Sequence, residues 1–517
     1  MSALRRVLML RKVLCDPRCS SNKPQRYFQT SLCNMDANTS TYEVLQSTFS
    51  ESGAGAMIAE KKCKWFCHYY SALVFEEKIN LLRMLSQQFG VNQDNVINVA
   101  HHVITSQEKG DATLLMAEER LRNALTPKYR ELFHQIGRIE GGVKFLVDLR
   151  ADILSHLSGA SVDKEIPYFR SLNSMLQELL VLWFSVGFLN LERVTWESAC
   201  DVVQKISEYE AVHPIRNWAD LKQRVGPYRR CFVFTHNSMP REPVVVLHTA
   251  LASQISDSIH SIVFRTYQRS SSVAGSEDGK HSSSTDTDRD LEEPSLINAA
   301  VFYSITSTQR GLQGVDLGNY LIKRVVRELQ AEFPHLNQFS SLSPIPGFKD
   351  WLITEINKYL HETNIGEFPQ NVLFTAEELS HLSAYAERGN EPPMACVKHI
   401  LQAGTWVEKE PLCSHLKTPL MRLCARYLYV EKRRGRALNP VANFHLGNGA
   451  VMWRLNWLGD TSSRGITQSC GMMVNYRYYL EQTEENSRKY LENHEITASE
   501  QVVELCTDVA AVYPVSS

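Results

Sequence analysis

A serine and a histidine lie where two predicted elements end, and both residue types can move protons. Ser343 stands in the segment FSSLSPIPGF, in which Pro344 and Pro346 supply no amide donors, so a central strand must stop near the serine. His445 lies between an Asn-Pro break and the apolar run 450–457. Either residue could contact a substrate from such an edge. On spacing alone, however, a turn-forming serine and a packed histidine are the commoner interpretations, and no G-x-S-x-G elbow indicates a hydrolase.

A glycine-containing loop precedes these two residues in the chain. It lies between a predicted strand, 299–305, and a predicted helix with apolar residues on one face between 317 and 333. Three glycines allow its backbone to approach a ligand closely: Gly311, Gly314 and Gly318. Unpaired amides at a helix start suit a pyrophosphate, although an ordinary strand-to-helix turn remains the alternative. Asp316 would place an anion beside that phosphate, which the loop chemistry does not explain.

Two halves of different character must position these groups. Residues 39–215 carry apolar side chains at three- and four-residue spacing, which predicts a helical bundle for scaffolding or self-association. Residues 216–517 mix short β-rich runs with helices, including a closing helix within 476–491, so the fold class is α+β. The stretch 268–295 is rich in Ser, Asp and Glu. It cannot bury apolar surface, and we predict a disordered insertion.

Composition excludes several classes of function. The net charge of −2 gives no global basic field for nucleic acid. The twelve cysteines form no CxxC pair, and Cys63 and Cys67 more plausibly share a helix face than bind a metal. The longest charge-free apolar stretch, 179–191, is shorter than the roughly 20 residues of a membrane span, so we predict a buried helix there.

The first 38 residues form a separate segment. They are rich in arginine and poor in acids, and leucines can share one helical face, as in a mitochondrial transit peptide. A disordered basic tail is the alternative. Met35 could serve as an internal start that yields a leaderless, cytoplasmic form. Residues 514–517 do not form the S-K-L peroxisomal signal.

Several segments together carry a resemblance to a known family. The loop QGVDLG resembles the coenzyme A pyrophosphate loop of GCN5-related acetyltransferases. In order, VLHTAL, TQRGLQGVDLGNYLIKRVV, SSLSPIPGF, PLMRLCARYLY, ALNPVANFHLGNGAVMWRLNW and SCGMMVNYRYYLE resemble the malonyl-CoA decarboxylases. This resemblance implies a helical oligomerisation domain, 39–215, followed by an acetyltransferase-like catalytic domain, 216–517. It places the catalytic pair on Ser343 and His445. It places the coenzyme A loop on Gln313, Gly314, Val315, Asp316, Leu317, Gly318 and Asn319.

The resemblance also implies an activity and partners. The expected reaction converts malonyl-CoA to acetyl-CoA and carbon dioxide, and so controls the balance of fatty acid oxidation and synthesis. It requires no metal or organic cofactor, because the thioester is the electron sink. A mitochondrial matrix location and a homo-oligomer, a tetramer, are expected, with an interchain disulfide through Cys200. No nucleic acid partner and no membrane span are expected.

For the mechanism, the hypothesis makes His445 the proton donor to the enolate carbon, because histidine can carry a proton near neutral pH. Ser343 would bind the malonyl carboxylate or relay a proton, and Asn443 would orient the imidazole. Two other functions share the loop. One is a true acetyltransferase, which needs an acceptor amine, and the other is a non-enzymatic scaffold that binds the thioester without releasing carbon dioxide.

Overall fold

The computed structural model groups the chain into two compact units. The helical unit comprises residues 1–188, 236–240 and 309–315, and the sheet unit comprises the rest. The residues that the structure describes are 41–49, 58–159, 165–263, 292–315, 317, 321–366, 372–385 and 391–512. Outside them lie the predicted transit segment, 1–38, and the predicted insertion as far as residue 291, as do Asp316, Gly318 and Asn319.

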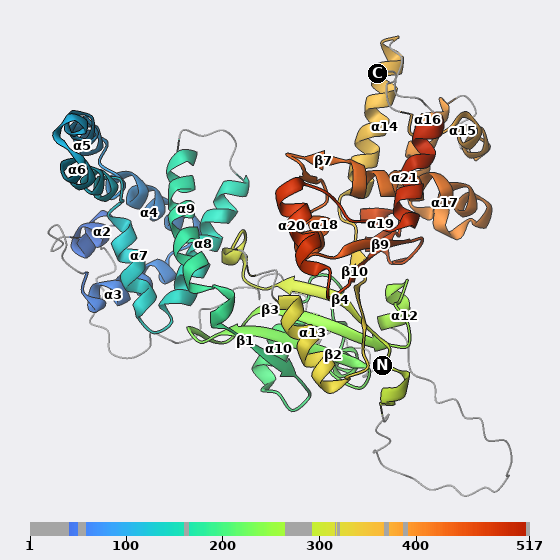
Figure 1. Ribbon diagram of the computed structural model, residues 1–517, viewed down its shortest axis with the longest axis horizontal. Helices are drawn as coiled ribbons and strands as arrows, with labels where there is room; N and C mark the ends of the chain where they lie inside the picture. Colours follow the sequence, from blue (N-terminus) through green and yellow to red (C-terminus); the bar gives the residue numbers. More distant parts are fainter. Residues whose placement is uncertain are drawn as a thin grey trace, which may run out of the picture. The chain divides into compact units, whose positions relative to one another are not determined.

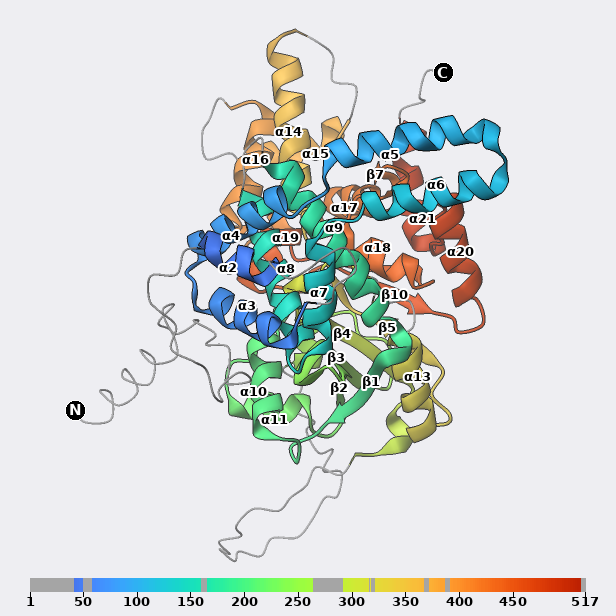
Figure 2. The ribbon, with the colours of Figure 1, turned by 90° about the vertical axis from the view of Figure 1, so that its left-hand side faces the viewer.

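Antiparallel and crossing helices build the helical unit (Figures 1 and 2). Its helices are α2 (Thr41–Phe49), α3 (Glu60–Ala72), α4 (Phe75–Gln88), α5 (Gln93–Ser106), α6 (Asp111–Ala124), α7 (Tyr129–Arg138), α8 (Gly142–Gly159) and α9 (Ile166–Trp183). Side chains that recur every three or four residues, such as Leu172, Leu176 and Leu179 of α9, fill one core. Cys63 and Cys67 are both buried in that core, which confirms their shared helix face.

The apolar stretch 179–191 differs from its prediction. Leu180 is buried, but Leu182 is 67% exposed, and the helix ends at Trp183. Strand β1 (Leu189–Val194) then pairs with β2 (Arg229–His236), so residues 189–215 belong with the sheet. The prediction of a single buried helix was therefore wrong, because a short apolar run is equally compatible with a strand. Within the described ranges, every helix is too short or too polar to cross a membrane.

The sheet unit is built on a mixed sheet with the strand order β1-β2-β3-β4-β5-β10-β6, and β9 pairs with β10. The remaining strands of this sheet are β3 (Met239–Ala252), β4 (Ala299–Ser307), β5 (Gln338–Ser341), β6 (Ser343–Pro344), β9 (Val451–Asn456) and β10 (Met473–Tyr478). Strands β4 and β5 are parallel, whereas β3 with β4 and β5 with β10 are antiparallel. Helix α13 (Leu321–Glu332) connects β4 to β5, as a parallel crossover requires.

Other helices surround the strands. They are α10 (Cys200–Tyr209), α11 (Trp218–Arg224), α12 (Ile259–Val263), α14 (Phe348–Asn364), α15 (Ala376–Ser383), α16 (Pro393–Ala403), α17 (Glu410–Ala425), α18 (Pro440–Gly447), α19 (Ser463–Ser469), α20 (Thr483–Asn493) and α21 (Glu500–Val512). Val203 of α10 and Leu221 of α11 pack with Val233 and Val246 of the sheet. The closing helix predicted within 476–491 is corrected to β10 followed by α20, and α21 comes after it.

Strand β10 brings the segment around Ser343 into register. It is antiparallel to β5, with Arg477 opposite Ser340, and then to β6, with Val474 opposite Ser343. One strand thus spans both sides of the interruption at Leu342. The position of Ser343 is consequently set by main-chain pairing rather than by a free loop.

Candidate active site

Ser343 lies where the structure interrupts its strand. Strand β5 ends at Ser341, the amide of Leu342 donates to Phe302 of β4 over 2.9 Å, and only two residues continue as β6. Pro344 follows directly and has no amide hydrogen, so the ladder cannot extend. The predicted strand end near Ser343 is confirmed. The serine is buried, with 4% of its surface exposed.

His445 lies in the last turn of the short helix α18. The helix starts after Asn439, whose side-chain oxygen accepts from the amides of Val441 and Ala442, each over 2.9 Å. Pro440 occupies the first turn, where a missing amide hydrogen costs nothing. These local signals start the helix one turn before the histidine, and the ring of His445 is buried in the sheet unit.

The serine and the histidine are in direct contact. The Ser343 hydroxyl oxygen lies 2.9 Å from Nε2 of His445. The other ring nitrogen, Nδ1, lies 2.7 Å from the hydroxyl of Tyr478. The imidazole also stacks on the ring of Tyr476, with 4.6 Å between ring centroids and an angle of 16° between the planes. Residues separated by 102 positions therefore form one buried hydrogen-bonded pair.

The hydrogen-bond partners indicate where the protons lie. Burial raises the pKa of the Tyr478 phenol, so this hydroxyl stays protonated. Among the described residues its acceptor is Nδ1 of His445, to which it donates. Nε2 then carries the imidazole hydrogen and donates to Ser343. Ser343 in turn donates to the hydroxyl oxygen of Ser341 over 2.8 Å. The four side chains make one directional chain of hydrogen bonds.

Burial corrects the expected protonation of the histidine. It lowers the pKa of His445 to about 3, because the charged ring would lose its hydration there. The resting imidazole is therefore neutral at physiological pH. The hypothesis that it carries a full charge near neutrality holds only if a bound anion raises this pKa.

Tyr478, rather than Asn443, orients the imidazole. Asn443 donates to the carbonyls of Ala437 and Asn439, over 2.7 and 3.1 Å, and accepts from Tyr490, so that hypothesis was wrong. The signal for Tyr478 was the alternation in NYRYYL, which places two tyrosines on one face of a strand. Tyr478 was missed because this segment was interpreted as helix.

Asn439 also joins the two halves of the site. Its amide nitrogen donates to the carbonyl of Pro346 over 2.9 Å, while its oxygen caps α18. Tyr427 donates to the same carbonyl over 3.1 Å. One buried side chain thus ties the segment that follows Ser343 to the helix that carries His445, which fixes their separation.

The predicted coenzyme A loop is described in part, and its described glycine residues lie in the helical unit. Gly314 has a φ of 76°, a conformation that favours glycine. The amides of Gln313 and Val315 donate to Arg310 and Leu312, over 3.1 and 3.0 Å. The expectation of unpaired amides is therefore wrong at these two positions, because the loop closes into tight turns. Leu317 is buried and belongs to the sheet unit.

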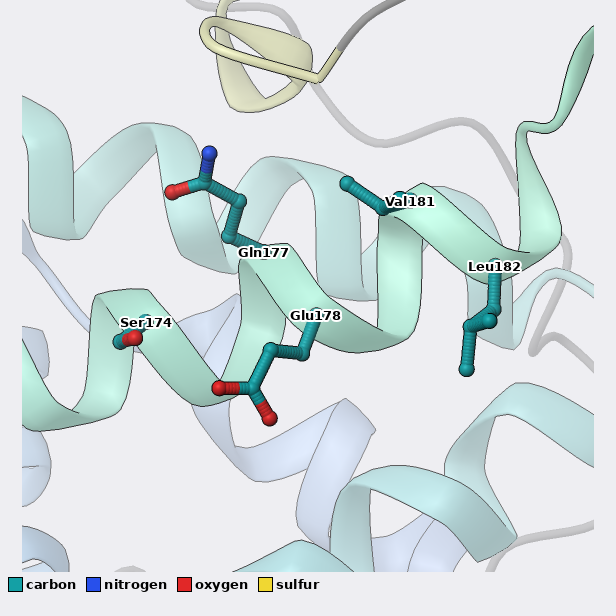
Figure 3. A pocket seen from close by; sticks show the side chains of 5 residues that line it. All are labelled: Ser174, Gln177, Glu178, Val181 and Leu182. Atoms are coloured by element: carbon teal, nitrogen blue, oxygen red, sulfur yellow. The ribbon is translucent and has the colours of Figure 1, made fainter.

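A hollow on α9 lies outside these predicted residues. It is shallow, with a volume of about 550 Å³, and it is lined by Ser174, Gln177, Glu178, Val181 and Leu182 (Figure 3). These residues belong to the helical unit, whereas Ser343 and His445 belong to the sheet unit. The described residues contain no group of three or more His, Cys, Asp or Glu side chains that could hold a metal ion.

Comparisons with known proteins agree across both units. The family model for the malonyl-CoA decarboxylase C-terminal domain matches residues 187–513, and that for the N-terminal domain matches residues 89–184. The mitochondrial malonyl-CoA decarboxylase of Rattus norvegicus is 51% identical over 450 residues, which cover 86% of this chain and 85% of the relative. That of Anser anser anser is 49% identical over 448 residues, covering 86% and 83%.

Solved structures show the same similarity. The crystal structure of malonyl-CoA decarboxylase from Agrobacterium vitis superposes with a TM-score of 0.72 at 29% identity, covering 90% of this chain and 99% of the other. The enzyme from Rhodopseudomonas palustris gives a TM-score of 0.70 at 29% identity, covering 90% and 100%.

Replacing Tyr478 with phenylalanine should release the imidazole from its preferred tautomer. We expect Tyr478→Phe to lower kcat by roughly 10-fold or more, with a much smaller change in KM, since the lost hydrogen bond acts through His445. The adjacent Tyr479→Phe, whose hydroxyl lies outside the hydrogen-bonded chain, is the control. Steady-state kinetics check this. Equal kcat values in the two variants would remove Tyr478 from the site.

The low pKa of His445 also predicts a pH dependence of stability. The unfolded histidine binds a proton near pH 6.5 and the folded one only near pH 3, so the unfolded state holds more protons between these values. The free energy of unfolding should fall as the pH drops from 7 toward 4, by up to about 1.4 kcal/mol per pH unit for this residue. Urea titrations should give a shallower slope for His445→Asn than for the exposed control His260→Asn. Identical slopes would contradict the prediction.

Proposed function

Because this chain belongs to the malonyl-CoA decarboxylase family, we propose that Ser343 and His445 are the catalytic pair that acts on the malonyl group. The chain is an enzyme that decarboxylates malonyl-CoA to acetyl-CoA and carbon dioxide. The observation that carries the assignment of residues is the 2.9 Å contact between the Ser343 hydroxyl and Nε2 of the buried imidazole. The resemblance of SSLSPIPGF and NPVANFH to the family motifs supports the same two residues.

The chemistry sets what the pair must do. When carbon dioxide leaves, the electron pair of the broken bond remains on the acetyl group as a thioester enolate. That carbon must then gain a proton, so each turnover consumes one proton. Preorganised donors stabilise the developing oxyanion, and a poorly hydrated carboxylate is lost more readily. A serine and a histidine that are almost fully buried suit both requirements.

Ser343 is proposed to bind the malonyl carboxylate. Its hydroxyl hydrogen rests on Ser341 over 2.8 Å, and a carboxylate is the stronger acceptor, so the hydrogen can turn to the substrate. The negative charge beside the ring raises the pKa of His445, because opposite charges at short range favour the ionised form. Substrate binding would therefore charge a histidine that is neutral in the resting enzyme.

His445 is proposed to return the proton after carbon dioxide departs. Its Nε2 hydrogen moves to the enolate carbon, directly or through the oxygen of Ser343, and the ring becomes neutral again. Tyr478 can follow this change because its hydroxyl can donate to Nδ1 or accept from it. The proton needed for each turnover thus enters as the imidazolium and leaves in the methyl group of acetyl-CoA.

The segment Gln313–Asn319 is proposed to bind the diphosphate of coenzyme A. Its support is its place between β4 and α13 and the left-handed backbone at Gly314. Since the amides of Gln313 and Val315 are occupied by turns, the phosphate contacts would fall to Gly314 and the later residues.

Assembly and location are proposed on similar grounds. The relatives are named as mitochondrial enzymes, and a mitochondrial location follows for this chain. We propose that the enzyme lies in the matrix and that a start at Met35 yields a cytoplasmic form.

We propose a homo-oligomer, a tetramer, that forms through the helical unit. Cys200 is exposed at the start of α10, where a thiol can reach a second copy and form the proposed disulfide.

Removing either member of the pair tests the catalytic proposal. Ser343→Ala and His445→Asn should each lower kcat by about 10²-fold or more, the scale of lost acid–base catalysis. The assay is carbon dioxide release from the purified protein given malonyl-CoA alone, which also excludes an acetyltransferase because no acceptor amine is present. His260→Asn is the control. Turnover at the wild-type rate in either site variant would overturn its assignment.

Cysteine substitution tests the proposed disulfide. Oxidised wild-type protein should run as a covalent dimer on a non-reducing gel, and Cys200→Ser should abolish that band. Cys506→Ser, a change at a half-buried thiol, is the control and should leave it intact. A dimer band that persists in Cys200→Ser would show that another cysteine forms the bridge.

A further inference from the structure

The hydroxyl of Ser341, beside the proposed catalytic pair, has a hydrogen that the resting site does not use. Ser341 is the last residue of β5 and is 0% exposed. Its hydroxyl oxygen accepts from Ser343 over 2.8 Å and from the amide of Tyr476 over 3.3 Å. A serine oxygen has two lone pairs, and these two donors fill both. Among the residues that the structure describes, no acceptor takes the hydrogen of Ser341 itself.

The two incoming bonds also fix where this hydrogen points. Around a hydroxyl oxygen, the bonded carbon, two accepted hydrogens and the hydroxyl hydrogen occupy the corners of a tetrahedron, so the first three determine the last. A buried donor without an acceptor costs free energy, because it has lost its bond to water and gained none in return. Beside a serine that is proposed to bind an anion, such a donor marks the place of a ligand oxygen.

The main chain and a polar side chain hold Ser341 in place. Strand β5 is paired on both of its edges, with β4 and with β10. The carbonyl of Ser341 accepts from the amide nitrogen of Asn475 over 2.8 Å. The side-chain oxygen of Asn475 accepts in turn from Arg454 over 3.0 Å and from Asn456 over 2.8 Å. The hydroxyl of Ser341 is therefore preorganised, which is the property that makes a donor effective at a developing charge.

A malonyl group has an oxygen that can reach this donor. Its carboxylate and its thioester carbonyl are bonded to the same carbon, so a carboxylate held by Ser343 brings the thioester oxygen close to the same place. The hydroxyl oxygens of Ser343 and Ser341 are only 2.8 Å apart. When carbon dioxide leaves, the electron pair of the broken bond forms the double bond of the enolate, and the negative charge falls on the thioester oxygen.

We propose that Ser341 is a further catalytic residue, whose unused hydroxyl hydrogen donates to the thioester oxygen as it becomes the oxyanion of the enolate. This inference rests on the proposed contact of Ser343 with the malonyl carboxylate. When Ser343 turns its own hydrogen to the carboxylate, the amide of Tyr476 still holds Ser341. The oxygen of Ser343 already accepts from His445, so the charged oxyanion is the stronger acceptor for the Ser341 hydrogen.

Ser341→Ala tests this role with malonyl-CoA as the substrate. It should lower kcat by about 10²-fold or more, the scale for loss of one oxyanion donor, with a far smaller change in KM because the bond strengthens as charge develops. Ser341→Thr keeps a hydroxyl and should recover most of kcat. The control is Ser469→Ala, which removes another buried hydroxyl of the sheet unit, bonded to the carbonyls of Gly465 and Met472. Wild-type kcat in Ser341→Ala, or an equal loss in Ser469→Ala, would overturn the proposal.

The infrared spectrum of the bound product separates donation from a structural defect. A hydrogen bond to the thioester oxygen lowers the frequency of its carbonyl stretch. With acetyl-CoA labelled with carbon-13 at the carbonyl, this frequency should be lower in the wild type and Ser341→Thr than in Ser341→Ala, and equal frequencies would contradict donation. Wild-type turnover in Ser343→Ala and His445→Asn would instead overturn the proposed pair. If those two variants lose activity while Ser341→Ala keeps it, only the role of Ser341 is overturned.

Discussion

The contact between Ser343 and His445 is the constraint around which the sheet unit is organised. Both side chains are almost fully buried, and a buried polar group must find a partner or lose the free energy of its hydration. The chain from Tyr478 through His445 and Ser343 to Ser341 meets this demand with each polar atom in contact. In the resting site, where Tyr478 donates to Nδ1, the same bonds that stabilise the fold also select the tautomer.

Main-chain pairing and one side chain hold that contact in place. Strand β10 pairs with both β5 and β6, so the residues on either side of the interruption at Leu342 cannot shift independently. The same strand carries Tyr476 and Tyr478, which stack on the imidazole and bond to it. Asn439 then links the carbonyl of Pro346 to the start of α18. The separation of serine and histidine is thus determined by the pairing of β10 with β5 and β6 and by the hydrogen bonds of Asn439.

The sequence predicted the parts of this arrangement that have local causes. Two prolines ended the strand beside Ser343, and periodic apolar residues predicted the amphipathic helices. Tyr478 was missed because the region 476–491 was assigned to a closing helix, although NYRYYL alternates and its first residues pair with β5 and β9 as a strand. The low pKa of His445 was beyond prediction for a related reason: it comes from burial by residues distant in sequence, which no local pattern reports. Asn443 lies two residues before His445, yet its side chain bonds to Ala437 and Asn439, because proximity in sequence is a poor guide to side-chain contact.

Burial also bears on the proposed role of His445, in which a ring that is neutral at rest supplies the proton that decarboxylation consumes. In a low-dielectric site, an isolated charge is unfavourable, which is why the resting ring is uncharged. The same low dielectric strengthens the attraction between an imidazolium and a carboxylate, so the bound malonyl group changes the balance far more than it would in water. In the proposed mechanism, protonation of His445 is thus coupled to binding of the malonyl anion. When carbon dioxide leaves, the negative charge passes to the enolate, and transfer of the proton from the imidazolium to carbon neutralises both charges, which a low-dielectric site favours.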